Sequence, residues 1–205
     1  MLLKADEIAH RLDLPADAAE RIVIRPQPII EGEKLGAASV DLRLGCWFGQ
    51  LRRTRMTHFD IGSTSDGAIK DVRPLKRHFV PFGQRFILHP RDFVLAATLE
   101  WIRMPPELAG YVIGRSSWGR RGLIIETAAG VHPGFTGCLT LELSNVGQIP
   151  ITLSPGLEIC QLFIHRVECK DRESRDNSAF VGFRRPVLSE IRADKIADAI
   201  GKDPF

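Results

Sequence analysis

The sequence has few cysteines and no long hydrophobic run, and both shortages exclude classes of protein. Its 205 residues include 4 cysteines, which form no CxxC pair: Cys46, Cys138, Cys160 and Cys169. Such sparse thiols do not build a disulfide scaffold, and they favour a reduced, cytoplasmic setting in which cysteines act as small hydrophobic side chains. No stretch approaches the ~20 apolar residues that span a bilayer, and the acidic residues between Met1 and Asp13 are not typical of a signal peptide. We therefore expect a soluble protein with no membrane partner.

A strong excess of charge is also absent. The 28 Lys and Arg residues nearly balance the 25 Asp and Glu residues, for a formal net charge of +3. This small surplus suits an anionic small-molecule substrate and does not indicate a nucleic-acid partner. The composition is that of a globular protein long enough to bury a core. We expect one main domain over residues 1–170 and a polar tail over residues 171–205.

The metal motifs of nucleotide deaminases are missing as well. The zinc deaminase signature, H-x-E followed by P-C-x-x-C, does not occur, and no other His/Cys set has the spacing of metal ligands. A Walker loop is absent too, because no Gly-Lys-Ser/Thr sequence occurs. If this protein deaminates a base, it must do so without zinc.

Short strand candidates fill the middle of the chain. Gly, Pro and Asn separate them, as is typical of an all-β sandwich or barrel. They are Ser39–Leu44, Arg85–Leu88, Phe93–Leu99, Leu108–Gly114, Leu123–Thr127, Cys138–Ser144, Ile151–Leu153 and Leu157–Val167.

Helices are expected near both ends of the chain, and a long polar excursion between two strands. Leu2–Leu12 has the spacing of a short amphipathic helix. A last helix is predicted from Ser189, with Ile191, Ile196 and Ile200 as its apolar stripe. Thr54–Lys76 is polar and basic, which favours a long surface segment.

The segment Gly114–Gly122 combines two hydroxyls, three arginines and several glycines. Glycine allows a ligand to approach the backbone closely, and arginine binds phosphate oxygens through a fork of N–H groups. The segment is therefore either a phosphate-binding turn or a solvated basic turn.

Glu142 lies in a strand whose alternation places Leu139, Leu141 and Leu143 on one face and Thr140, Glu142 and Ser144 on the other. A carboxylate in such a place either faces water or, if that face lines a cleft, becomes a candidate general base. His132, in a turn before Pro133, has the same ambiguity, because a lone loop histidine is usually structural or solvated.

A series of segments between residues 36 and 167 follows one known family in order and composition. They are Gly36–Gly45, Phe86–Pro90, Leu95–Glu100, Leu108–Gly110, Gly114–Ser117, Arg120–Leu123, Pro133–Gly137, Leu139–Asn145, Pro155–Gly156 and Gln161–Leu162. Together they resemble the dCTP deaminases of the dUTPase superfamily. This resemblance implies a mainly β fold, a distorted β-barrel (β-clip) with short terminal helices. It also implies a homotrimer with active sites between subunits, and a substrate held as its magnesium triphosphate.

The resemblance also implies roles for individual residues. Glu142 would be the general acid/base in the conversion of dCTP to dUTP and ammonia, which feeds pyrimidine deoxynucleotide synthesis. The catalytic water would be held by Ser116, Arg120 and the carbonyl of Ala129. Phe135 would pack on the deoxyribose. Nucleotide contacts are expected at Arg115, Ser116, Ser117, Trp118, Gly119, Arg120, His132, Phe135, Thr140, Leu141 and Gln161.

Two departures from the family pattern keep alternatives open. His132 stands where an aspartate is expected to bind the 3′-hydroxyl and to serve hydrolysis. The tail pattern Ser-Lys-Tyr-x-Gly-Gln is replaced by Ser178–Phe183, without its lysine and glutamine. The alternatives are a dUTPase, a bifunctional deaminase and dUTPase, and a nucleotide-binding regulatory protein without turnover. Glu142 favours the deaminase, since plain dUTPases typically lack a glutamate there.

Overall fold

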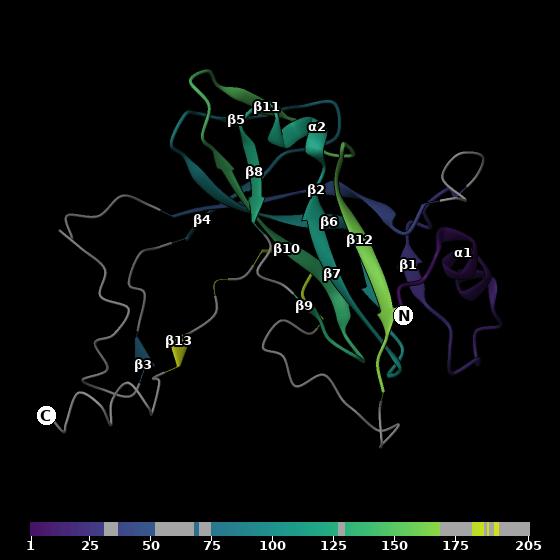
Figure 1. Cartoon of the computed structure of the whole chain (residues 1–205). Coiled ribbons are helices and arrows are strands. Elements are labelled where there is room, and N and C mark those ends of the chain that lie inside the picture. Colours follow the sequence, from purple (N-terminus) through teal and green to yellow (C-terminus); the bar gives the residue numbers. More distant parts are fainter. Residues whose placement is uncertain are drawn as a thin grey trace, which may run out of the picture.

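One curled antiparallel sheet dominates the computed structural model, and it forms a half-barrel (Figure 1). The structure describes residues 1–30, 37–51, 68–69, 75–126, 130–168, 182–186, 188 and 191–192. The main path through the sheet is β8-β10-β6-β2-β12-β7-β9. Its strands are β2 (Val40–Leu51), β6 (Phe93–Arg103), β7 (Leu108–Gly114), β8 (Leu123–Glu126), β9 (Gly130–Val131), β10 (Thr136–Asn145) and β12 (Glu158–Arg166). The expected mainly β, barrel-like architecture is confirmed.

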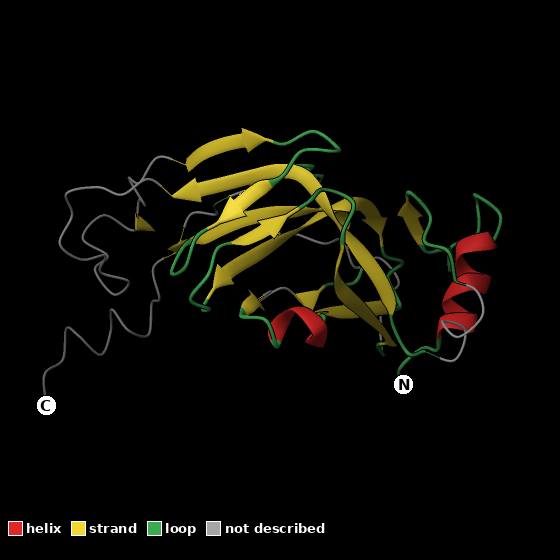
Figure 2. Cartoon of the chain, turned by 90° about the horizontal axis from the view of Figure 1, so that it is seen from above, coloured by secondary structure: helices red, strands yellow, loops and turns green. Residues whose placement is uncertain are grey.

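Smaller elements extend or cover this sheet. Strand β1 (Val23–Arg25) pairs with β6, and β4 (Leu75–Phe79) pairs with β2. Strands β5 (Phe86–Leu88) and β11 (Ile151–Leu153) form a separate pair. Viewed from above, the strands form curved layers, and helix α1 (Ala5–Asp13) lies at one end of them (Figure 2). No helix in the described part of the chain is long and apolar enough to cross a membrane.

The core follows from the alternation of the strands. In β10 every second residue is buried, so Leu139, Leu141 and Leu143 point into the core as predicted. Phe48 of β2 stacks on Phe86 of β5, with 4.6 Å between ring centroids. Alternation therefore places one face of β10 in the core and leaves the face with Glu142 partly open to solvent.

Helix α1 confirms the amphipathic pattern expected near the N-terminus. Ile8 and Leu12 are buried in the core, and Arg11 forms ion pairs with Glu7 at 2.9 Å and Glu107 at 3.1 Å. The helix is thus attached to the sheet by both apolar packing and charge.

The predicted terminal helix is wrong at its beginning. Ile191–Arg192 forms strand β13, which pairs with β3 (Ala68–Ile69). Isoleucine is β-branched and favours extended backbone, and a strand from a distant segment supplies its hydrogen-bond partners. Ile196 and Ile200 lie outside the described residues, as does most of the polar excursion before Leu75.

The cysteines behave as the sequence predicts where they are described. Cys160 is buried, while Cys46 and Cys138 are half-buried, and none of the three is in a disulfide. Burial raises the pKa of the Cys138 thiol to about 11. These thiols are therefore protonated at neutral pH and act as apolar side chains. Cys169 lies outside the described residues.

Candidate functional site

The basic glycine-rich segment forms a strand, a short helix and a tight turn. Strand β7 ends at Gly114, and helix α2 (Ser116–Gly119) follows at once. Gly122 has φ +88°, and a Cβ there would come within 2.9 Å of the backbone nitrogen of Gly147. Only glycine fits such a position without strain, so it controls how the chain turns from α2 into β8.

Several predicted nucleotide contacts on α2 are accessible. Ser116, Gly119 and Arg120 are exposed, and Ser117 is half-buried. Arg121 instead donates a hydrogen bond of 2.7 Å to the backbone carbonyl of Ser117. Arg120 and Arg121 therefore differ in availability for a ligand, because the Arg121 guanidinium is hydrogen-bonded to the helix itself.

Trp118 attaches α2 to the sheet. Its indole N–H donates a hydrogen bond of 2.9 Å to the carbonyl of Glu158 in β12, and its ring packs against the core. Trp118 therefore supports the helix, whereas the sequence predicts it as a nucleotide contact.

Arg115 lies in a charged network that sequence reasoning missed. Its guanidinium forms an ion pair with Asp41 at 3.1 Å and a second, closer one with Glu158. Because two carboxylates already compensate its charge, a phosphate would have to compete with them for this guanidinium.

The network continues into the core through Arg43. Its Nη2 lies 3.5 Å from Glu158 Oε1, and its backbone N–H donates a 2.8 Å hydrogen bond to Glu100. Glu100 has 0% exposure, and burial raises the pKa of its carboxyl against the opposing influence of Arg43. Glu100 thus connects the core to the ion pairs around Arg115. The signal in the sequence was a charged residue within the apolar strand β6.

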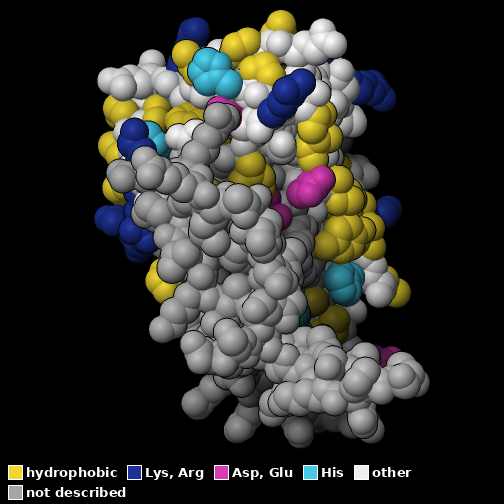
Figure 3. Space-filling model, turned by 90° about the vertical axis from the view of Figure 1, so that its left-hand side faces the viewer, with side chains coloured by type: hydrophobic (Ala, Val, Ile, Leu, Met, Phe, Trp, Pro, Cys, Tyr) yellow, Lys and Arg dark blue, Asp and Glu magenta, His cyan; other side chains and the backbone are white. Residues whose placement is uncertain are grey.

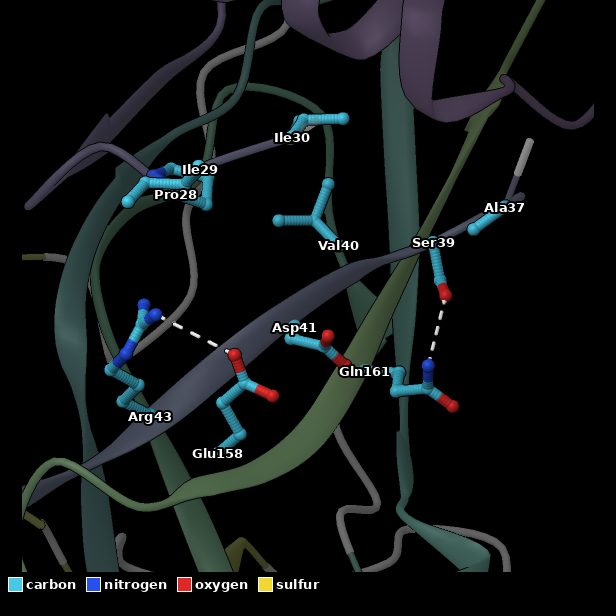
Figure 4. Close-up of a pocket in the computed structure, with 10 residues that line it drawn as sticks. All are labelled: Pro28, Ile29, Ile30, Ala37, Ser39, Val40, Asp41, Arg43, Glu158 and Gln161. Atoms are coloured by element: carbon cyan, nitrogen blue, oxygen red, sulfur yellow. Dashed lines mark hydrogen bonds and ion pairs between the residues drawn. The ribbon is translucent and has the colours of Figure 1, made fainter. Parts of the chain in front are cut away.

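A small cavity borders the same network (Figure 4). It has a volume of about 30 Å³, which is room for about one water molecule rather than a nucleoside. Gln161, a predicted phosphate contact, lies here and donates a 3.3 Å hydrogen bond to the Ser39 hydroxyl. The cavity lies beside Gln161 of β12. Its lining is Pro28, Ile29, Ile30, Ala37, Ser39, Val40, Asp41, Arg43, Glu158 and Gln161.

Glu142 lies in β10, which pairs with β6 on one side and with β8, at the end of the sheet path, on the other. It is half-buried and stands opposite Leu95 on one side and Glu126 on the other. Burial, and to a lesser extent the negative charge of Glu126, raise the pKa of its carboxyl. Thr140 shares its face, while Leu141 is buried in the core. A carboxyl with a raised pKa is a stronger base than a free one and can still return the proton.

The turn before β10 contains two further predicted nucleotide contacts, one exposed and one buried. His132 is exposed, and its carbonyl accepts a 3.1 Å hydrogen bond from the N–H of Phe135. Phe135 is only 6% exposed and belongs to the core cluster. Its ring therefore supports the turn, whereas the sequence predicts that it packs on a deoxyribose. Ala129 lies outside the described residues.

A short part of the tail returns to the beginning of β10. Gly182 donates a 2.6 Å hydrogen bond to the Thr136 carbonyl, and Cys138 donates one of 2.9 Å to the Phe183 carbonyl. Arg185 lies over the ring of Trp47 at 4.2 Å. The tail is therefore attached to the strand that bears Glu142.

The predicted site residues thus lie on different elements of the fold. The accessible hydroxyls and Arg120 belong to α2, and Glu142 belongs to the strand face shared by β8 and β10. In the described part of the chain, no three His, Cys, Asp or Glu side chains come together in a way that could hold a metal ion.

Comparisons with known proteins agree on a family. A family model described as dCTP deaminase-like matches residues 2–167. A dUMP-forming dCTP deaminase of Mycolicibacterium paratuberculosis is 42% identical over 183 residues, which cover 86% of this chain and 92% of the relative. The enzyme of the same description from Mycobacterium tuberculosis is 42% identical over 157 residues, covering 74% of this chain and 80% of the relative.

A solved structure supports the fold. The 2′-deoxycytidine 5′-triphosphate deaminase of Agrobacterium tumefaciens superposes with a TM-score of 0.56 at 20% identity. The match covers 82% of this chain and 48% of that one, so the present chain spans about half the length of that relative. The two chains therefore share the path of their strands.

Proposed function

The chain belongs to the dCTP deaminase-like family, and from this membership we propose that it hydrolyses dCTP to dUTP and ammonia with Glu142 as the general acid/base. Its curated relatives at about 42% identity make it an enzymatic deaminase. The observation that carries the proposed mechanism is the half-buried carboxyl of Glu142, whose pKa burial raises.

The reaction requires a group that moves protons in two directions. Ionised Glu142 takes one proton from water as the water oxygen bonds to C4 of cytosine, and it delivers this proton to N3. It then takes the proton of the new hydroxyl and delivers it to the exocyclic amino group. The C4–N bond breaks, a C4 carbonyl forms, ammonia leaves and Glu142 is ionised again. A raised pKa suits this role, since one carboxyl must act as base and as acid.

The remaining roles are distributed over the neighbouring segments. The hydroxyl of Ser116, the guanidinium of Arg120 and the carbonyl of Ala129 hold the attacking water. The triphosphate, with its Mg²⁺, binds along α2, where N–H, hydroxyl and guanidinium groups are the natural partners of phosphate. The exposure of Ser116 and Arg120 supports this arrangement. Arg115 contributes after the phosphate has displaced part of its ion pairing with Asp41 and Glu158.

A second candidate differs in the product. The relatives named above are described as dUMP-forming, which favours deamination followed by release of pyrophosphate. His132 favours dUTP as the final product, because an aspartate is expected there for the hydrolytic step. The exposure of His132 leaves it accessible to a bound sugar.

One assay tests the deaminase proposal and separates these products. Purified protein is incubated with dCTP and Mg²⁺, and ammonia and pyrophosphate are measured separately. Ammonia without pyrophosphate supports dUTP as the product, and equal amounts support dUMP. Nucleotide binding without either product would contradict the deaminase assignment and favour the regulatory alternative.

We further propose the homotrimer that the family resemblance implies. An exposed apolar surface supports it: Tyr111 and Ile113 of β7 are 41% and 48% exposed. Tyr111 stacks on Phe163 of β12, with 5.2 Å between ring centroids. Hydrophobic side chains also form a band beside acidic ones along the right-hand edge of the surface in Figure 3. Such patches on folded proteins mark contacts with other chains.

A charge placed on this surface tests the intersubunit site. Ile113→Glu should give a monomer by light scattering and abolish turnover. Ile87→Glu, which changes an isoleucine of β5 that is 55% exposed, is the matched control and should keep the assembly. An active 22.9 kDa monomer of the unaltered chain would contradict the shared-site arrangement.

A further inference from the structure

Two carboxylates stand directly opposite each other across β8 and β10. The antiparallel register pairs Glu126 with Glu142, and the next pair along is Ile125 with Leu143. The Cβ atoms of directly opposed residues lie about 4.5–5.5 Å apart and their side chains share one face of the sheet. Glu126 is exposed and Glu142 is half-buried. The pair thus places a solvated negative charge beside a less solvated one.

Apart from Glu126, the strand neighbours of Glu142 in the described part of the chain carry no charge. Strand β6 contributes Leu95, opposite Glu142, and Ala97 and Phe93 at the flanking positions. On its own strand the same face bears Thr140 and Ser144. In the described part of the chain, neither glutamate forms an ion pair with a basic side chain. Like charges directly opposite each other destabilise a sheet, so the arrangement needs another reason.

We propose that Glu126 is a positioning residue for the proton of Glu142: its fixed negative charge favours the state in which Glu142 holds the proton taken from water. The inference rests on the proposed deaminase function. Glu126 exchanges no proton itself. The proton moves from water to Glu142 and from there to the base, and the neighbouring charge makes the intermediate protonated state of Glu142 more stable.

The pKa of Glu142 is shifted in the direction that this geometry predicts. After burial, the charge of Glu126 is the second cause that raises the pKa of Glu142. Removing that charge should therefore lower the pKa of Glu142. Since ionised Glu142 begins the reaction, the acidic limb of the pH profile of kcat/KM should move to lower pH.

The experiment compares the pH dependence of kcat/KM for dCTP in matched variants of the full chain. Glu126→Gln removes the charge at nearly constant size and should move the acidic midpoint to lower pH. Glu126→Asp retains the charge and should restore the midpoint toward that of the unaltered chain. Glu20→Gln makes the same chemical change at an exposed position near α1 and should leave the midpoint in place. An unchanged midpoint in Glu126→Gln would overturn the proposal, because a merely structural role changes rates without moving the profile.

A direct titration separates this inference from the proposed function. Carbon NMR of side-chain carboxyls, with Glu142 assigned by the signal lost in Glu142→Gln, follows its protonation with no substrate present. A lower midpoint for Glu142 in Glu126→Gln supports the coupling, and an unchanged one overturns it. If the titration shows the coupling but the unaltered chain releases no ammonia from dCTP, the deaminase function fails and the catalytic use of the pair fails with it.

Discussion

Replacing the carboxyl of Glu142 with an amide is the most informative perturbation of this molecule. Glu142→Gln keeps the size and hydrogen-bonding reach of the side chain but removes its basic oxygen. The hydroxyls of Thr140 and Ser144, which share its face, are not bases at neutral pH. Loss of a general base typically lowers the rate by ~10²–10⁴-fold, or about 3–5.5 kcal/mol of transition-state stabilisation.

Glu126 does not replace the lost base, because it acts on Glu142 through its charge and exchanges no proton itself. We therefore expect the single variant Glu142→Gln near the upper end of this range, roughly 10⁴-fold. Since Glu126 acts only through the opposite carboxyl of Glu142, the double variant with Glu126→Gln should lose little more. Binding of nucleotide should change far less in both variants, because α2 supplies the proposed phosphate contacts.

Stability gives an independent check of the same variant. The pKa of Glu142 is raised in the folded chain, so its ionised form opposes folding. This cost is absent below the unfolded-state pKa and fully present above the folded-state pKa. Glu142→Gln should therefore unfold at an equal or higher urea concentration than the unaltered chain at neutral pH.

The assay for Glu142→Gln combines ammonia release, a nucleotide-binding titration and urea denaturation on one preparation. Glu20→Gln serves as the control for the loss of a carboxylate. The reasoning is refuted if Glu142→Gln keeps more than about a tenth of the unaltered turnover. It is also refuted if turnover is lost only together with nucleotide binding.

Four other substitutions test the surroundings of the site. Arg43→Met removes the guanidinium that lies 3.4 Å from the buried Glu100 carboxylate and keeps the backbone hydrogen bond to it. Urea denaturation should show a loss of roughly 2–4 kcal/mol, since Arg43 itself is partly exposed. Burial raises the pKa of Glu100, so this deficit should shrink as the pH falls and Glu100 takes up a proton; a deficit independent of pH contradicts the assignment. Gly122→Ala should lower the unfolding free energy by about 1–3 kcal/mol, because φ is +88° there; an unchanged denaturation midpoint would show that the turn relaxes freely. Arg120→Ala should raise KM for dCTP roughly 10–150-fold, whereas Arg121→Ala, whose guanidinium binds its own helix, should have little effect; similar KM values for both would remove Arg120 from the phosphate site.

The local sequence pattern was sufficient to predict the main strands and the orientation of the Glu142 side chain. Period-two alternation around Leu141 places the glutamate on the opposite face from the core, and the structure confirms this. The strand at Leu108–Gly114 has the predicted bounds. These features depend on residues within a few positions of one another, which is the range over which alternation and turn residues act. The prediction of a terminal helix was wrong because Ile191 pairs with a strand that is distant in the sequence, which a local pattern does not reveal.

Only the tertiary structure brought the charges of the site together. Glu126 faces Glu142 because β8 and β10 pair in one particular register. The ion pairs of Arg115 with Asp41 and Glu158 require β2, β7 and β12 to lie side by side. Residues so far apart in the chain meet only after the sheet has curled, and a shift of register by one residue would turn each side chain to the other face. The sequence by itself therefore determined which side chains are available for chemistry, and the pairing of the strands decided which charges each of them meets.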